Sequence, residues 1–296
     1  MLLLFRLLAR MPLPILHAMG ALAGWLTYLG SPTYRERFRA NVAAAGLPWA
    51  ACRPAIAAAG CMITETPWLW LRPPAERLGA LVRWEGTEFV EAARAQGRGV
   101  LFLTPHLGCF EITAQAYAER YCSTDSPITV LYRPARKDWL KRVVDDSRGR
   151  PGLATAPASL AGVRQMIRAL RQGQTIGLLP DQVPPDGLGV WAPFFGKPAY
   201  TMTLAARLVQ QTGAVLLLIW GERLPGGQGF AVHVMPAPEL PPAEAGAEAA
   251  ATVINGAMES MIRNAPGQYL WGYHRYKSPR GLDIGAAPVS DAGAQR

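Results

Sequence analysis

The sequence predicts an α/β fold in which helices flank a mixed central sheet, with an apolar segment ahead of it. Short apolar runs typical of buried strands alternate with helical patterns along most of the chain. One of these runs, residues 100–104, leads through a tight turn into a helix. Residues 2–30 are mostly apolar and carry charge only at Arg6 and Arg10. These three observations lead to the expected fold class.

The apolar N-terminal segment favours a membrane anchor. Residues 13–29 hold one histidine and no charge, which is just long enough for a short membrane span. A cleaved signal peptide is disfavoured, because the chain behind it lacks paired cysteines. The alternative is an interfacial helix, with three arginines just beyond it near anionic headgroups. We therefore expect residues 1–30 to form an uncleaved anchor that either spans the bilayer or lies at its surface.

Composition also points to a lipid surface. Half of the residues are hydrophobic and 17% are charged, against about 25% in an average soluble domain, and the net charge is +9. Such a chain suits a peripheral protein on anionic lipid. Nucleic acid is not expected as a partner, because no Lys/Arg run, zinc-finger spacing or aromatic RNA-binding motif is present. The cysteine spacing and the small number of histidines disfavour a metal site, and no cofactor is expected.

The most informative motif is His106 in the turn after residues 100–104, with Glu111 five positions later. Gly108 lets the turn bend closely, and a helix is expected from about residue 109 to 121. Positions five apart on one helix point about 140° away from each other. A His106–Glu111 contact therefore requires the histidine to lie ahead of the helix.

A carboxylate beside one imidazole nitrogen would fix the tautomer and leave the other nitrogen free as a base. The helix N-terminus would supply backbone N–H groups for a developing oxyanion. Such a pair suits the removal of a proton from a hydroxyl that attacks an acyl carbonyl. The spacing alone leaves open a purely structural alternative, in which His106 caps the helix and Glu111 is solvated.

The His106-x4-Glu111 motif resembles the H-x4-D/E motif of the glycerolipid acyltransferase superfamily, and more closely that of the bacterial lipid A late acyltransferases. Further blocks resemble that family in the right order, over most of residues 1–277. The closing block departs from the family pattern at Gly272-Tyr273, beside His274. The blocks are Tyr132-Arg133-Pro134, Pro180-Asp181-Gln182, Phe194-Phe195-Gly196 and YLWGYHRYK at residues 269–277.

The remaining elements follow from periodicity, caps and breakers. Helices are expected at residues 34–45, 50–71, 88–96 (capped by Thr87), 159–171 (capped by Ser159), 201–211 and 247–263. Strands are expected at residues 81–85, 128–132, 175–179, 215–220 and 229–235. No flexible linker divides the chain, so we expect one catalytic domain over residues 31–277 and a disordered tail over 278–296.

The resemblance implies roles for the residues in these blocks. His106 and Glu111 would be catalytic, with Glu111 orienting His106. Arg133, at a strand's carboxyl end, could hold a phosphate, although a surface arginine is the alternative. Phe194 and Phe195 could line an acyl-chain groove or belong to the core. The substrate-binding set it implies is Arg133, Asp181, Gln182, Phe194, Phe195, Gly196, His274 and Arg275, with Asp181 and Gln182 in a positioning role.

The resemblance also implies the reaction. A fatty acyl chain would pass from acyl–acyl carrier protein to a hydroxyl of a lipid A precursor (Kdo2-lipid IVA type) on the cytoplasmic face of the bacterial inner membrane. Residues 133–150 hold seven basic and three acidic residues, which suits an acidic carrier protein or a phosphorylated glycolipid. Open alternatives are a lysophospholipid or aminolipid acceptor, a hydrolase, and a non-enzymatic membrane-binding protein.

Overall fold

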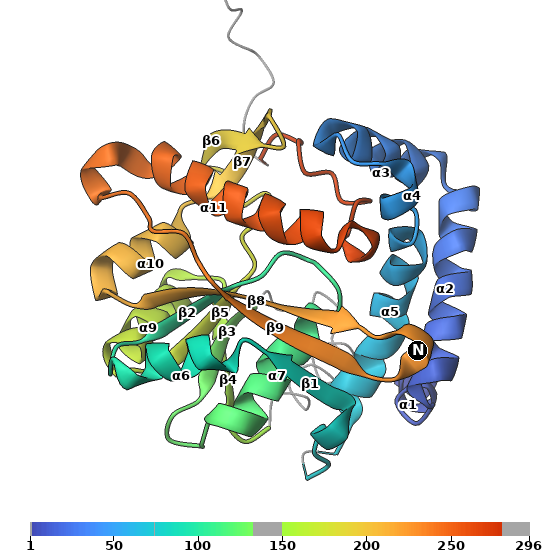
Figure 1. Cartoon of the computed structure of the whole chain (residues 1–296), viewed down its shortest axis with the longest axis horizontal. Helices are drawn as coiled ribbons and strands as arrows, with labels where there is room; N and C mark the ends of the chain where they lie inside the picture. Colours follow the sequence, from blue (N-terminus) through green and yellow to red (C-terminus); the bar gives the residue numbers. More distant parts are fainter. Residues whose placement is uncertain (1, 74, 133–149, 280–296) are drawn as a thin grey trace, which may run out of the picture.

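The computed structural model describes residues 2–73, 75–132 and 150–279. At its centre is a seven-stranded sheet in which all neighbours are parallel except β8 and β9, so the sheet is mixed (Figure 1). A separate antiparallel hairpin lies beside it. Across the sheet the strands are β1 (Val82–Glu85), β9 (Phe230–Pro236), β8 (Val215–Arg223), β2 (Val100–Leu103), β5 (Thr175–Leu178), β3 (Ile128–Tyr132) and β4 (Leu153–Pro157), and the hairpin is β6 (Gly189–Phe194) and β7 (Lys197–Met202).

Helices cover both faces of the sheet. The central strand β2 is apolar on both sides and therefore needs cover on both faces. All four of its residues are buried, with Leu101 and Leu103 in one hydrophobic cluster and Val100 and Phe102 in the other. A strand buried on both faces is typical of parallel sheets. One face carries α6 (Thr87–Ala95) and α7 (Phe110–Tyr121), and the other carries α9 (Leu160–Arg171), α10 (Leu204–Thr212) and α11 (Gly246–Asn264).

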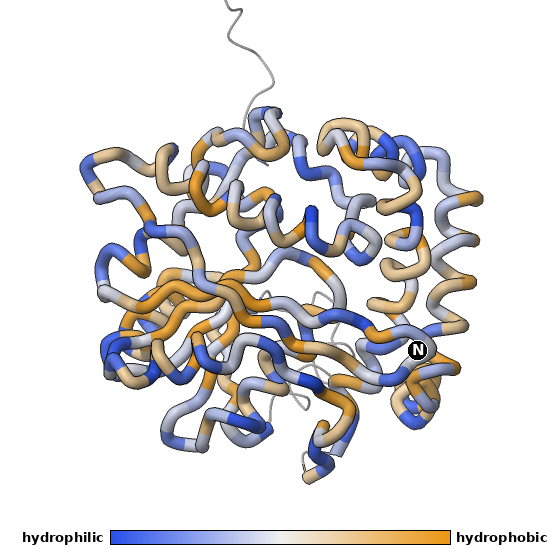
Figure 2. Tube along the Cα trace, viewed as in Figure 1, coloured by the Kyte–Doolittle hydropathy of each residue, from blue (hydrophilic) through white to orange (hydrophobic). Residues whose placement is uncertain are grey.

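The N-terminal region adds a helical layer at one end of the sheet (Figure 1). One of its helices, α2, is long and apolar enough to cross a membrane. Figure 2 shows apolar residues on the side of α2 that faces away from the rest of the chain. The helices of this layer are α1 (Leu2–Leu8), α2 (Leu13–Gly30), α3 (Pro32–Ala45), α4 (Trp49–Cys52) and α5 (Ala55–Leu71).

The predicted fold class, a mixed sheet between helices, is confirmed. Several local expectations were wrong or incomplete. The helix expected at residues 50–71 is divided into α4 and α5, because Pro54 lacks the N–H group that a continuous helix needs. The cap of α6 is Gly86 rather than Thr87, and the helix expected from residue 201 begins at Leu204, after β7. The strands β4, β6 and β7 were not predicted. Apart from its first two residues, the expected tail lies outside the described part of the chain.

A buried ion pair joins the N-terminal layer to the sheet. The guanidinium of Arg223, at the end of β8, donates to both carboxylate oxygens of Glu65 on α5 at 2.6–2.9 Å. The carboxylate of Glu65 also lies 3.1 Å from Nε2 of His17, on α2. Glu65 and Arg223 are 1% and 8% exposed. Burial raises the pKa of Glu65, but the charge of Arg223 and the hydrogen bonds outweigh burial, so the net shift is downward.

We predict that Glu65→Gln lowers the free energy of unfolding by about 3–5 kcal/mol, because it leaves the charge of Arg223 buried without a partner. Urea denaturation measures this change. Arg77→Gln serves as the control, since Arg77 is mostly exposed in its pair with Glu119 and should change stability by less than about 1 kcal/mol. The folded-state pKa of Glu65 is lowered, so its contribution is complete above the unfolded carboxyl pKa of about 4.3 and is lost as the pH falls further. Equal losses in the two variants would contradict this account.

Candidate active site

His106 lies in the turn between β2 and α7, as the sequence predicts. The N–H of Thr104 still pairs with the carbonyl of Leu178, so the turn begins at the end of the sheet. Gly108 has a φ of 57°, and a Cβ added there would lie 2.0 Å from the carbonyl oxygen of Gly221. Only glycine fits this close approach of two backbones. The turn therefore holds His106 at the carboxyl edge of the sheet.

The carboxylate that meets His106 belongs to Asp181. Its Oδ1 lies 2.7 Å from Nδ1 of the imidazole, and its Oδ2 accepts from the backbone N–H of His106 at 2.9 Å. Two hydrogen bonds to one residue fix both the position and the rotation of the ring. Asp181 follows β5, the strand paired with β2, and both residues come three positions after the paired strand ends Leu103 and Leu178.

The other imidazole nitrogen faces Gln182. The amide Nε2 of Gln182 lies 3.0 Å from Nε2 of His106. An amide nitrogen can only donate, so the imidazole Nε2 accepts and its proton resides on Nδ1, facing Asp181. In the neutral form of the ring, this tautomer leaves a lone pair on Nε2. That nitrogen can act as a base once a substrate hydroxyl replaces the amide.

Asp181 is ionised although it is 2% exposed. Burial raises the pKa of Asp181, but attraction to the protonated form of the His106 ring and the two hydrogen bonds from His106 outweigh burial, so the net shift is downward. Tyr269 lies beside the same carboxylate, and burial together with the negative charge of Asp181 raises the pKa of its hydroxyl well above the ordinary value. A charged Asp181 can stabilise the imidazolium that forms when His106 takes up a proton.

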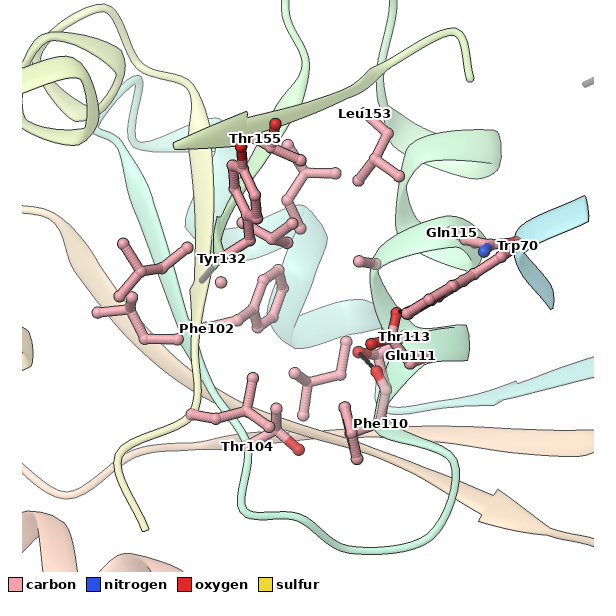
Figure 3. Close-up of a pocket in the computed structure, with 18 residues that line it drawn as sticks. Trp70, Phe102, Thr104, Phe110, Glu111, Thr113, Gln115, Tyr132, Leu153 and Thr155 are labelled. Carbon is pink, nitrogen blue, oxygen red and sulfur yellow. Dashed lines mark hydrogen bonds between the residues drawn. The ribbon is translucent and has the colours of Figure 1, made fainter. Parts of the chain in front are cut away.

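Glu111 occupies a different position from the one expected. It lies in the first turn of α7, and its Oε2 accepts from the indole Nε1 of Trp70 at 3.3 Å. Figure 3 shows the two side chains meeting at the wall of a pocket. Asp181 instead takes the place on His106 that the spacing assigned to Glu111. The pairing of the strands explains this. The end of β5, which lies beside β2, brings Asp181 to Nδ1 of His106, whereas Glu111 lies on the helix that follows the turn.

The pocket beside Glu111 has a volume of about 150 Å³ and is lined mostly by apolar side chains. Thr104 and Phe110, on either side of His106 in the sequence, form its wall near the turn of His106, and the Phe110 ring lies 4.9 Å from the imidazole. Leu153 and Thr155 lie at another part of the wall (Figure 3). An apolar cavity with few polar groups suits a hydrocarbon chain.

The buried pair of Arg223 and Glu65 also holds the turn of His106 in place. The Nη2 of Arg223 donates to the carbonyl of Gly108 at 2.7 Å, and the N–H of Cys109 donates to the carbonyl of Gly221 at 2.7 Å. Sequence reasoning missed Arg223, Glu65, Trp70 and Tyr269. Asp181 was expected to have a positioning role, and the pairing of neighbouring strand ends was the signal that could have assigned it to His106.

Phe194 and Phe195 are core residues and not the wall of an exposed groove. They are 2% and 6% exposed and pack in the main hydrophobic cluster. Phe195 and Gly196, with φ angles of 47° and 72°, form the two-residue turn between β6 and β7. Two positive φ angles are typical of a type I′ hairpin turn. The F-F-G block is therefore a turn whose side chains are buried, with the backbone N–H of Phe195 donating to Glu259.

The closing block also has a structural role. Arg275 is 2% exposed and donates to the carbonyl of Tyr200 and the hydroxyl of Thr201, both at 2.7 Å. It holds the β6–β7 hairpin and is not free to bind substrate. His274 is exposed, and partial burial with the charges of Arg37 and Lys277 lowers its pKa. Arg133 lies outside the described residues.

No group of three or more His, Cys, Asp or Glu side chains among the described residues is arranged to hold a metal ion. What the site offers is a histidine whose ring is oriented by a buried carboxylate on Nδ1, with Nε2 on the opposite side of the ring and an apolar pocket nearby. This combination can activate a hydroxyl beside a bound acyl chain.

The chain is similar in sequence to known proteins. The chain is 29% identical to the lipid A biosynthesis lauroyltransferase of Escherichia coli over 228 residues, which covers 75% of this chain and 70% of the relative. It is 26% identical to the lipid A biosynthesis palmitoleoyltransferase of the same organism over 220 residues, covering 74% and 69%. The family of bacterial lipid A biosynthesis acyltransferases matches residues 1–278. The chain is therefore an acyltransferase and belongs to the bacterial lipid A biosynthesis acyltransferase family.

Proposed function

We propose that the protein transfers a fatty acyl chain from acyl–acyl carrier protein to a hydroxyl of a lipid A precursor of the Kdo2-lipid IVA type. The observation that carries the proposal is the hydrogen-bonded chain Asp181–His106–Gln182 beside an apolar pocket. The names of the relatives, a lauroyltransferase and a palmitoleoyltransferase of lipid A biosynthesis, support fatty acyl donors and this class of acceptor.

In the proposed reaction Nε2 of His106 removes the proton of the acceptor hydroxyl as its oxygen attacks the thioester carbonyl. The new C–O bond forms, the C–S bond breaks, and the carrier thiolate takes the proton from the imidazolium. Asp181 keeps the imidazole oriented and balances its charge. The N–H groups at the start of a helix lie beyond its regular hydrogen-bond ladder, so the start of α7 is suited to the oxyanion.

Glu111 remains a catalytic residue in this proposal, with a changed task. Its carboxylate lies at the pocket, next to the turn of His106, where it can accept from the acceptor hydroxyl and hold it in place. The pocket receives the acyl chain. We also propose that the active domain spans residues 31–277, that the basic residues 133–150 receive the acidic carrier protein, and that the enzyme works at the cytoplasmic face of the inner membrane behind its N-terminal anchor.

We predict that His106→Ala lowers acyl transfer by at least about 10²-fold, since general base catalysis contributes roughly 10²–10⁴-fold. The assay uses radiolabelled acyl–acyl carrier protein and a tetra-acylated Kdo-lipid A precursor in detergent micelles. His233→Ala is a matched control, because His233 likewise pairs with acidic side chains, Glu85 and Glu222, but belongs to β9. Equal transfer by wild type and His106→Ala would make His106 structural. Activity of the wild type on a lysophospholipid alone would preserve the chemistry and reject the acceptor.

Asp181→Asn and Glu111→Gln separate the two carboxylates. Asp181→Asn should lower kcat by roughly 10²-fold or more with little change in the acceptor KM, because it disturbs the tautomer of the base. Glu111→Gln should raise the acceptor KM as well, because in this proposal the carboxylate of Glu111 accepts from the acceptor hydroxyl. Steady-state kinetics with varied acceptor measures both. The same effect in the two variants would contradict the division of roles.

We predict that Gly177→Val shifts the donor preference toward shorter acyl chains. Gly177 lines the pocket, and a Cβ there meets only Cγ1 of Val130 at 3.5 Å, so added methyl groups extend into the cavity. Competition between a long-chain and a short-chain acyl–acyl carrier protein measures the ratio. Circular dichroism confirms that the variant folds. An unchanged ratio would show that the acyl chain binds elsewhere.

A further inference from the structure

Exposed apolar side chains gather on the two N-terminal helices. Of the fourteen large hydrophobic side chains that are exposed in the described residues, eight belong to α1 and α2, and they are 41–82% exposed. On α2 they recur at alternating steps of four and three positions, so they share one helix face. We call this set the N-terminal stripe: Leu3, Leu4, Leu7, Ile15, Met19, Leu22, Leu26 and Leu29.

The opposite face of α2 is part of the fold. Gly20 and Gly24 are buried against α5, and a Cβ added to Gly60 of α5 would lie 1.8 Å from the carbonyl oxygen of Gly20. A Cβ on Gly24 would lie 2.2 Å from the carbonyl oxygen of Ile56. The two helices therefore touch backbone to backbone over more than one turn, which only small residues allow.

Polar contacts fix the same face of α2. The hydroxyl of Thr64 donates to the carbonyl of Leu16 at 2.7 Å, and His17 contacts the carboxylate of Glu65 at 3.1 Å. Glu65 in turn pairs with Arg223 on β8. If α2 crossed the bilayer while packed in this way, α5 and the buried ion pair would have to enter the hydrocarbon with it, which is costly. Its 18 residues would also span only about 27 Å, against about 30 Å for the hydrocarbon core.

Arginines lie at both ends of the N-terminal stripe. Arg6 and Arg10 are exposed at the α1 end, and Arg37 and Arg39 are exposed on α3, which follows α2. Long basic side chains extend toward headgroups while apolar neighbours are buried in lipid. A helix parallel to the surface brings both sets of arginines to the headgroups of one leaflet. A spanning helix would place them on opposite sides.

We propose that α1 and α2 form a docking surface for one leaflet of an anionic bilayer, with α2 parallel to the membrane plane and the N-terminal stripe in the acyl-chain boundary. This rests on the membrane location given under the proposed function and specifies how the chain sits there. Because α2 is tied through Glu65 and Arg223 to the carbonyl of Gly108, this orientation also places the catalytic turn at a fixed height above the leaflet.

Labelling of the two ends of α2 tests the orientation. The full-length protein, with its four cysteines replaced by alanine, receives a single cysteine by Arg10→Cys or Gly30→Cys, both exposed positions. It is bound to preformed vesicles of phosphatidylethanolamine and phosphatidylglycerol, and a membrane-impermeant maleimide is added outside. Labelling of both ends at the same rate is expected. Protection of one end until detergent is added would show a spanning helix and overturn the proposal.

Paired substitutions test the surface itself. Leu22→Gln with Leu26→Gln should lower vesicle binding at least about tenfold, since each loses most of a buried leucine's transfer energy. The control, Leu160→Gln with Leu188→Gln, changes leucines that are 78% and 56% exposed outside the N-terminal stripe. Equal binding by the two pairs would reject the N-terminal stripe as the docking surface. Normal binding and labelling without acyl transfer would reject the proposed function and leave this inference standing.

Discussion

The arrangement of the site depends on the pairing of two parallel strands. β2 and β5 pair from Val100 and Thr175 to Leu103 and Leu178. Three residues after these strand ends come His106 and Asp181. The register of the sheet therefore brings the imidazole of His106 to the carboxylate of Asp181 at 2.7 Å. A shift of one residue would turn these side chains to opposite faces. The geometry of the His106–Asp181 pair is thus set by the core of the sheet.

The same core supports the turn from the other side. Arg223 comes from the end of β8, the strand on the other side of β2, and its guanidinium both pairs with Glu65 and holds the carbonyl of Gly108. A buried ion pair of this kind contributes less to stability than its geometry suggests, because both charges have lost their water. What it supplies is one fixed arrangement of an N-terminal helix, the sheet and the turn of His106, which the proposed base requires.

The sequence predicts the parts of this protein that local patterns determine. The apolar run before His106, the glycine in its turn and the following helix are all in place, because each depends on neighbouring residues. Asp181 as the partner of His106 required knowledge of which strands are neighbours, and spacing along the chain favoured Glu111. The F-F-G block was given a binding role, whereas its buried side chains and positive φ angles make a hairpin turn. The packing of α2 on α5 depends on glycines 40 residues apart in the sequence, which no local pattern reveals.

The position of the proton on the His106 ring can be measured, and it tests whether Asp181 fixes the tautomer that leaves Nε2 free as a base. The chain has four histidines, so ¹⁵N-labelled imidazoles can be resolved by NMR and the signals of His106 identified by their loss in His106→Ala. We expect the proton of the neutral ring to reside on Nδ1, and we expect Asp181→Asn to remove this preference. A proton on Nε2 in the wild type would mean that the nitrogen facing the substrate carries no lone pair, and it would contradict the role given to Asp181.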